Sequence, residues 1–327
     1  MTDPTVLVTG ANGFVGSSLI ARAAGYRCIG LVRRAIGGSE RAPGASGERR
    51  SVTAWSEEAL YDVLDGVDAV VHSASVVHRP GAPDSEYVAF NVGGTRALLA
   101  ACKRRGIQRL IHVSSIKVHG ENPIGIIDEK TPTAPEGAYA QTKLEAERIV
   151  LEASAQGGPS ATIFRLCPVY GVGDKGNVRT MIRAIARRRF AVPGDGSTRK
   201  SLVHVSTVSD AIVAALGARH DGIFVLADNE TPTLRRLADA IARALGKSAP
   251  PRMPAAMMMG AAGVIQRVAQ LVGRQTAISP QLIRKSLIDT VCTPALLEAT
   301  FGIRCHRDLT RSIEEEVSWL RREERLG

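Results

Sequence analysis

Residues 5–16 read TVLVTGANGFVG, and this stretch decides the fold class of the chain. The β-branched run at 5–9 predicts a strand, the glycines that follow predict a tight turn, and the pattern after them predicts a helix. Gly10 permits the turn, Gly13 lets the backbone approach a pyrophosphate, and Gly16 lets the helix pack closely on the strand. The stretch therefore predicts a dinucleotide site, with the diphosphate on free N–H groups at the helix start.

A second stretch carries side chains that can move a proton. Tyr139 and Lys143 are four residues apart, so on a helix they would lie on one face. The Lys143 ammonium could then lower the pKa of the Tyr139 phenol toward working pH. Ser115, at the end of a predicted apolar strand, could hydrogen-bond the same substrate oxygen. A spacing of four is common on surface helices, so the predicted catalytic set depends on its combination with the glycine turn.

With the glycine turn, Ser115 and the Tyr139 and Lys143 pair, the chain resembles the extended short-chain dehydrogenase/reductase family, in its nucleotide-sugar epimerase and reductase branch. The resemblance covers nearly the whole chain. It implies an α/β fold, a doubly wound parallel (Rossmann) sheet with a smaller, mostly helical C-terminal substrate-binding lobe. Alternating strand and helix patterns through residue 171 agree with this fold. We expect the dinucleotide-binding core at 1–171 and mainly the substrate-binding lobe at 172–327, with some segments returning to the core.

The resemblance also assigns residues to the cofactor. The segment 73–75 would follow the fourth strand and pass over the dinucleotide, and residue 168 would follow the sixth strand. The expected cofactor-binding residues are Gly10, Asn12, Gly13, Phe14, Val15, Gly16, Arg33, Arg34, Ser73, Ala74, Ser75, Asn91, Tyr139, Lys143 and Pro168.

The end of the predicted second strand indicates which dinucleotide binds. NAD enzymes of this fold usually carry an acidic residue there, which accepts hydrogen bonds from the ribose hydroxyls. This chain has Arg33 and Arg34 instead, and guanidinium groups suit a 2′-phosphate. We expect NADP(H) in preference to NAD(H), which is the alternative if both arginines are solvated loop charges. The acidic residue that the family places near the adenine is missing from 50–53.

Three segments of the second half, 175–178, 190–196 and 199–205, look like those that clamp a nucleoside diphosphate in this branch. Arg199 or Lys200 could neutralise the diphosphate. We expect a UDP-linked sugar as the partner molecule. The expected substrate-binding residues are Lys117, Asn177, Val178, Ala191, Pro193, Arg199 and Lys200.

The residues after Ser115 narrow the reaction. Nucleotide-sugar 4,6-dehydratases of the family carry an Asp-Glu pair where this chain has Ile116 and Lys117, so we expect no dehydration. The resemblance implies action at C4 of a UDP-hexose or UDP-N-acetylhexosamine in bacterial polysaccharide biosynthesis, by a 4-epimerase or a 4-ketosugar reductase. Preference for NADPH would favour the reductase.

Two other functions stay open at this stage. One is a reductase or dehydrogenase of a small carbonyl or alcohol, as hydroxysteroid and flavonoid reductases of the same extended family are. The other is a non-catalytic dinucleotide sensor, which is disfavoured because Ser115, Tyr139 and Lys143 are retained together.

Composition limits the partners. A net charge of +10 would suit nucleic acids, but the basic runs fall at the ends of helix-like segments and no nucleic-acid motif accompanies them. Five scattered cysteines without metal-like spacing predict reduced thiols and no metal site. The first residues show no signal-peptide pattern. We expect a cytoplasmic homodimer that binds no nucleic acid.

Residues 254–272 form an apolar, methionine-rich stretch that Gln266, Arg267 and Gln270 interrupt, so we expect no membrane span. Such a helix most often fills an irregular core or a subunit surface, and we expect one of these here. Contact with an acidic membrane surface is the less favoured alternative.

Overall fold

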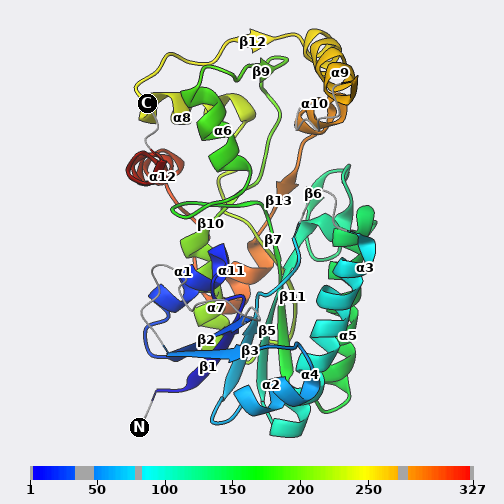
Figure 1. Cartoon of the computed structure of the whole chain (residues 1–327). Coiled ribbons are helices and arrows are strands. Elements are labelled where there is room, and N and C mark those ends of the chain that lie inside the picture. The colour runs from blue at the N-terminus through cyan, green and yellow to red at the C-terminus, as the bar shows by residue number, and fades with distance from the viewer. Residues whose placement is uncertain (1–2, 34–47, 78–82, 272–278, 325–327) are drawn as a thin grey trace.

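A computed structural model of the chain describes residues 3–33, 48–77, 83–271 and 279–324. Within these residues, seven strands form one sheet in the order β11-β7-β5-β4-β1-β2-β3, and every neighbouring pair is parallel (Figure 1). The strands are β1 (Thr5–Thr9), β2 (Arg27–Arg33), β3 (Glu48–Val52), β4 (Ala69–His72), β5 (Arg109–Ser115), β7 (Ser160–Leu166) and β11 (Gly222–Leu226). The order reverses between β1 and β4, and ligands of open parallel sheets bind at such a point.

Helices cover both faces of the sheet because successive side chains of a strand point to opposite faces. In β1, Val6 and Val8 belong to one apolar core and Leu7 belongs to the other. The first core is covered by α1 (Phe14–Arg22), α7 (Val205–Gly217) and α11 (Ala295–Phe301). The second is covered by α2 (Glu57–Val63), α4 (Gly94–Arg105) and α5 (Gly137–Ala155), with α3 (Asp84–Tyr87) and the π-helical turn η1 (Val88–Gly93) preceding α4. The predicted fold class is confirmed.

A smaller lobe, mostly helical, adjoins the carboxyl ends of the strands (Figure 1). Ile182, Leu237 and Ile313 belong to its own apolar core. Its helices are α6 (Asn177–Ala186), α8 (Leu234–Ala244), α9 (Ala255–Leu271), α10 (Pro280–Ser286) and α12 (Leu309–Glu324). Short parallel pairs join distant segments: β8 (Val169–Tyr170) with β10 (Val203–His204), β9 (Val192–Pro193) with β12 (Arg252–Met253), and β6 (Ile126–Ile127) with β13 (Val291–Cys292). Although α7, β11 and α11 follow residue 171, they pack in the larger lobe.

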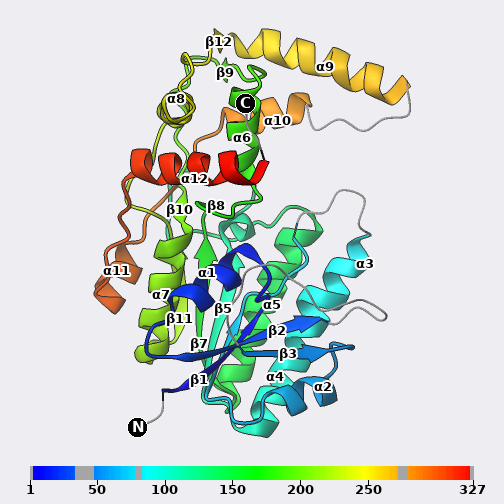
Figure 2. The ribbon, with the colours of Figure 1, turned by 60° about the vertical axis from the view of Figure 1, so that its left-hand side comes forward.

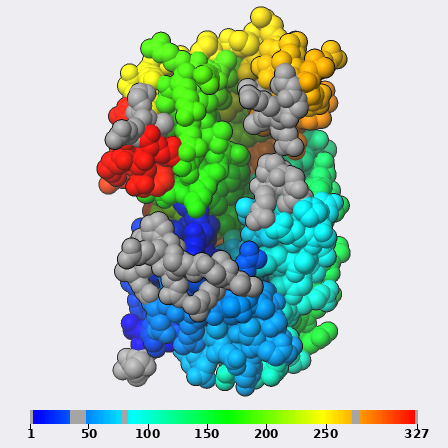
Figure 3. Space-filling model, in the orientation of Figure 1, coloured from blue at the N-terminus to red at the C-terminus, as the bar shows by residue number. Residues whose placement is uncertain are grey.

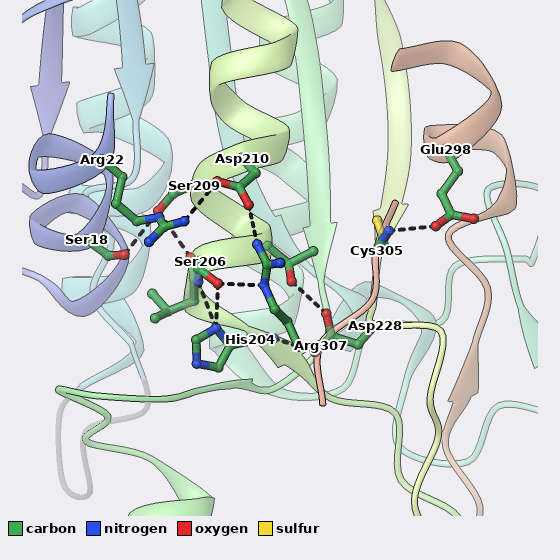
Figure 4. A network of polar contacts seen from close by, with 12 residues as sticks. Ser18, Arg22, His204, Ser206, Ser209, Asp210, Asp228, Glu298, Cys305 and Arg307 are labelled. Carbon is green, nitrogen blue, oxygen red and sulfur yellow. Dashed lines mark hydrogen bonds and ion pairs between the residues drawn. The ribbon is translucent and has the colours of Figure 1, made fainter. Parts of the chain in front are cut away.

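A polar network fixes α1 against α7 and the segment before α12 (Figure 4). Ser18 Oγ lies 3.1 Å from Ser209 Oγ, and Arg22 forms an ion pair of 3.3 Å with Asp210. Asp210 also pairs with Arg307. Because α1 begins at the glycine turn, the network also fixes the turn relative to the second half of the chain.

The methionine-rich helix α9 projects from the smaller lobe (Figure 2). Among its residues only Ala262 is buried, and several of its large apolar side chains are exposed. The sequence allowed a core or a surface position, and the structure excludes the core of this chain. In the part of the chain that the structure describes, no helix combines the length and the apolar character that crossing a membrane requires.

The packing of α1 on the turn before it gives a stability prediction. A Cβ on Gly16 would lie 2.3 Å from the carbonyl oxygen of Gly10, so α1 would have to move. We expect Gly16→Ala to lower the free energy of unfolding by about 1–3 kcal/mol in a denaturant titration.

Gly260→Ala is the matched control, because Gly260 also lies inside a helix and a Cβ there meets nothing within 4 Å. It should raise the free energy of unfolding by up to about 1 kcal/mol through helix propensity. Equal effects of the two substitutions would contradict the close-packing argument.

Candidate active site

A cavity of about 710 Å³ lies at the carboxyl ends of β1, β4 and β5. This is the size of a cofactor or ligand site. The glycine turn, Ser115, Tyr139 and Lys143 all line it. Figure 3 shows the molecular surface hollowed between the green part of the smaller lobe and the cyan part of the larger one.

The glycine turn fits a dinucleotide diphosphate. Gly10 has a φ of +69°, which favours glycine, and a Cβ there would lie 2.8 Å from the Ala74 nitrogen. Gly13 caps α1 without a side-chain hydrogen bond to the first turn. The N–H groups at the start of α1 are therefore not capped by that residue, and Phe14 and Val15 of this first turn line the cavity. Asn12, Gly16 and the segment 73–75 also line it.

The three predicted catalytic residues come together from two elements. Ser115 ends β5, and its Oγ accepts a hydrogen bond of 3.3 Å from the Lys117 nitrogen. Tyr139 and Lys143 lie one turn apart in α5. Lys143 Nζ donates to the Val113 carbonyl oxygen at 2.5 Å. Two neighbouring elements thus present a hydroxyl, a phenol and an ammonium to one cavity.

The electrostatics of the pair differ from the expectation. Burial raises the pKa of the Tyr139 phenol, and a hydrogen bond with Ser115 opposes this rise. Burial lowers the pKa of Lys143 to about 8, and the nearby Glu147 opposes that shift. The expected lowering of the tyrosine pKa by Lys143 is not met in this structure, because desolvation of the phenol dominates and the ammonium is bonded to the Val113 carbonyl.

A buried ion pair holds α5 in place. Glu147, one turn beyond Lys143, accepts from Arg165 of β7 at 2.7 Å and from Ser114 Oγ at 2.5 Å. Both charged side chains are at least 95% buried, at 1% and 5% exposure. A buried charge without its partner is costly, so this contact strongly restricts the position of α5 against β5 and β7.

Asn91 supports the cavity without lining it. It is buried in η1, its Oδ1 accepts from the Val76 nitrogen at 2.7 Å, and its Nδ2 donates to Thr142 Oγ1 at 3.1 Å. It therefore joins the segment after β4 to α5. Pro168 also lines the cavity.

Only one of the two residues predicted to select the cofactor lies within the described part of the chain. Arg33 is exposed at the end of β2 and lines the cavity with Leu31 and Val32. Its position fits a phosphate on the adenosine ribose, which the fold places beyond the end of the second strand. Arg34 lies outside the described residues.

A second cavity of about 310 Å³ adjoins the first, and both are lined by Ile116, Lys117 and Pro168. Asn177, Val178 and Lys200, which the sequence predicted as substrate-binding, also line it. Burial lowers the pKa of Lys200, whose Nζ donates to the Lys285 carbonyl oxygen at 3.0 Å.

Three other predicted residues are not among those lining either cavity. Ala191 precedes β9, Pro193 pairs with Met253 in the short β9–β12 sheet, and Arg199 forms an ion pair of 2.8 Å with Asp289. The Arg199 guanidinium is therefore already paired with the Asp289 carboxylate.

The structure adds lining residues that sequence reasoning missed. Trp55 and Phe90 line the first cavity with ring centroids 5.1 Å apart. A tryptophan just beyond the third strand was a usable signal, because the ends of parallel strands converge on ligand sites and aromatic side chains commonly line such sites. Lys285 and Leu282 of α10 line the second cavity, and no local pattern indicates that.

Known proteins resemble this chain over most of its length. The model of the NAD dependent epimerase/dehydratase family matches residues 6–227. An N-acetyl-α-D-glucosaminyl-diphospho-ditrans,octacis-undecaprenol 4-epimerase of Escherichia coli O157:H7 is 28% identical over 86% of this chain and 85% of its own. A UDP-glucose 4-epimerase of Vibrio cholerae is 28% identical over 74% and 76%. A crystal structure of UDP-glucuronic acid 4-epimerase from Bacillus cereus in complex with NAD has a TM-score of 0.75 at 20% identity, covering 98% of this chain and 99% of its own.

The position of Arg33 gives a prediction for cofactor choice. A lost charge-assisted hydrogen bond costs about 1.5–3 kcal/mol, so Arg33→Ser should weaken NADPH binding roughly 10- to 100-fold and leave NADH nearly unchanged. Fluorescence titration with each dinucleotide measures both constants. Arg27→Ser, at the opposite end of β2, should change neither. Equal weakening of both cofactors by Arg33→Ser would show that this side chain does not contact a 2′-phosphate.

Proposed function

The chain belongs to the NAD dependent epimerase/dehydratase family, and we propose that it is an NAD(P)-dependent oxidoreductase that acts at C4 of a UDP-linked sugar. The sugar would be a hexose or an N-acetylhexosamine of bacterial polysaccharide biosynthesis. The reaction would be 4-epimerisation or reduction of a 4-keto sugar. The observation that carries the proposal is the convergence of Ser115, Tyr139 and Lys143 on a cavity that the glycine turn also lines.

Tyr139 is the residue proposed to exchange a proton with the C4 oxygen. Its raised pKa keeps the phenol protonated, so it can donate to the oxygen of a 4-keto group. Ser115 would hold that oxygen by a second hydrogen bond. The bound dinucleotide supplies or accepts the hydride. Reduction of a 4-keto group would use the protonated phenol as the donor, whereas epimerisation would begin with Tyr139 as the acceptor.

The charges of the second cavity support a substrate with a diphosphate. Lys117, Lys200 and Lys285 line it, and Glu121 is the one carboxylate among its described lining residues. Glu121 pairs with Lys117 at 2.8 Å and with Lys285 at 3.3 Å. The cavity therefore has an excess of positive charge next to the proposed reaction centre, which favours an anionic ligand.

A second carrier of the diphosphate is a candidate. The Escherichia coli relative is named for a sugar on undecaprenol diphosphate, whereas the Vibrio cholerae relative is named for UDP-glucose. Beside its lysines, the second cavity is lined by apolar side chains of α6, α8 and α10, among them Met181, Leu237 and Leu282. An apolar wall beside cations suits a polyprenyl diphosphate as well as a nucleoside diphosphate.

Loss of the phenol tests the catalytic assignment. We expect Tyr139→Phe to lower the turnover of UDP-glucose or UDP-N-acetylglucosamine, followed by product chromatography, by roughly 10²-fold or more. Dinucleotide affinity should stay within a few-fold, because the ring is kept. Tyr61→Phe is the control, since that ring contacts Arg105 on the outer helices. Turnover close to that of the parent would remove Tyr139 from the mechanism.

Binding of the diphosphate can be tested without turnover. In the NADP-loaded protein, millimolar UDP should raise the melting temperature, because a ligand of the folded state stabilises it by RT ln(1 + [L]/Kd). Lys117→Gln should reduce that shift, and Lys103→Gln, at the end of α4, should preserve it.

Farnesyl diphosphate distinguishes the two carriers in the same assay. A shift with UDP supports the nucleotide sugar, and a shift with farnesyl diphosphate alone supports the lipid carrier. If neither ligand moves the melting temperature, the diphosphate-sugar proposal fails and a small carbonyl or alcohol becomes the better substrate class.

A further inference from the structure

The helix α9 exposes one continuous apolar stripe. Met257, Val264, Val268 and Leu271 are 63%, 61%, 54% and 86% exposed. Their spacing of seven, four and three residues places all four on one side of the helix. The buried Ala262 lies on the opposite side, where α9 packs on α10. The stripe therefore faces away from the lobe, on a helix that projects from it (Figure 2).

The stretch of sequence that contains the stripe is basic. The chain has 32 acidic residues, yet none lies between Asp239 and Asp289. The described part of that interval contains six cationic residues, which are Arg243, Lys247, Arg252, Arg267, Arg284 and Lys285. Arg267 is on α9 itself, and Arg284 is in the last turn of the adjacent α10.

We propose that α9 is a docking helix for an acidic lipid bilayer, lying in the plane of the interface with its apolar stripe among the lipids. An apolar face bordered by lysine and arginine is the pattern that anionic membranes bind. The helix lies on the surface and does not span, because Arg267 and two glutamines interrupt its apolar sequence.

A second copy of the chain fits this surface less well. In a two-fold symmetric dimer the same patch meets itself, so the cations around one α9 would face the cations around the other. No carboxylate of the 240–288 interval is present to compensate Arg267 and Arg284, whereas Lys285 is paired with Glu121 from outside the interval. Acidic headgroups supply the opposite charge. The predicted homodimer would therefore use another face.

The location of α9 gives the docking a consequence. The adjacent helix α10 contributes Leu282, Lys285 and Ser286 to the second cavity. Docking through α9 would thus hold that cavity close to the membrane surface, on the other side of α10. This inference concerns the surface alone and does not depend on which substrate the cavity takes.

Cosedimentation of the full-length protein with vesicles tests the proposal. We expect binding to vesicles of phosphatidylcholine mixed with phosphatidylglycerol, and much weaker binding to phosphatidylcholine alone. Val264→Gln combined with Leu271→Gln should lower the partition coefficient roughly tenfold or more, because two exposed apolar side chains leave the lipid. Melting temperature and dinucleotide affinity should not change, since both side chains are exposed.

Matched variants separate the apolar and the ionic contributions. Leu296→Gln removes an exposed leucine of α11, on the larger lobe, that is 46% exposed, and it should leave vesicle binding unchanged. Arg267→Gln with Arg284→Gln should weaken binding to acidic vesicles and reduce its dependence on salt. An equal loss with Leu296→Gln, or no loss with the α9 pair, would overturn the assignment of the surface.

A fluorescence measurement locates the contact. Leu271→Trp should show a blue shift of emission on acidic vesicles and none on neutral ones. Sedimentation velocity tests the competing interpretation, in which the stripe is an interface between copies of the chain. If the Val264→Gln and Leu271→Gln protein changes from dimer to monomer and the parent ignores vesicles, the stripe is an interface between copies and the membrane proposal is wrong.

Discussion

The close approach of α1 to the turn before it is the constraint on which the rest of the structure depends. A Cβ on Gly16 or Gly10 would lie within 3 Å of backbone atoms, so glycine at both positions brings the helix start to the carboxyl ends of β1 and β4. That contact creates the part of the cavity where an anion can meet backbone N–H groups. The packing of α1 on α7, together with the exposed ion pair of Arg22 and Asp210, then couples the first elements of the chain to its second half.

A second constraint places the proposed reacting groups in the cavity that the turn also lines. The buried Glu147 and Arg165 pair carries a large desolvation cost that only close, hydrogen-bonded geometry offsets. This pair holds α5 against the sheet at a point one turn beyond Lys143. Asn91 holds the same helix through a hydrogen bond to Thr142. Tyr139 thus reaches the cavity on a rigid element. Burial at this position raises the pKa of the phenol above its ordinary value of about 10, so the phenol has the protonated form that a proton donor needs.

The sequence predicted the parts of the site that rest on local geometry. The glycine turn and the Tyr139 and Lys143 spacing each involve one turn of chain, and the parallel sheet makes strand ends converge, so these residues came together. The smaller lobe was predicted less well. Arg199 is hydrogen-bonded to Asp289, 90 residues away, and no local sequence pattern reveals a contact over that separation. For the same reason the contribution of α10 to the second cavity, and the exposure of α9, became visible only in the structure.

One carboxylate links the smaller lobe to the segment that follows β5. Glu121 lies between Lys117, two residues after Ser115, and Lys285 of α10. Burial alone would raise the pKa of Glu121, but the two lysines outweigh this and lower it, so the carboxylate is charged and holds both cations. An entering diphosphate would offer the same lysines two stronger anionic partners and would compete with Glu121 for them. Because α9 packs on α10, the lysines proposed to meet the substrate anion and the surface proposed to meet a bilayer are connected through α10.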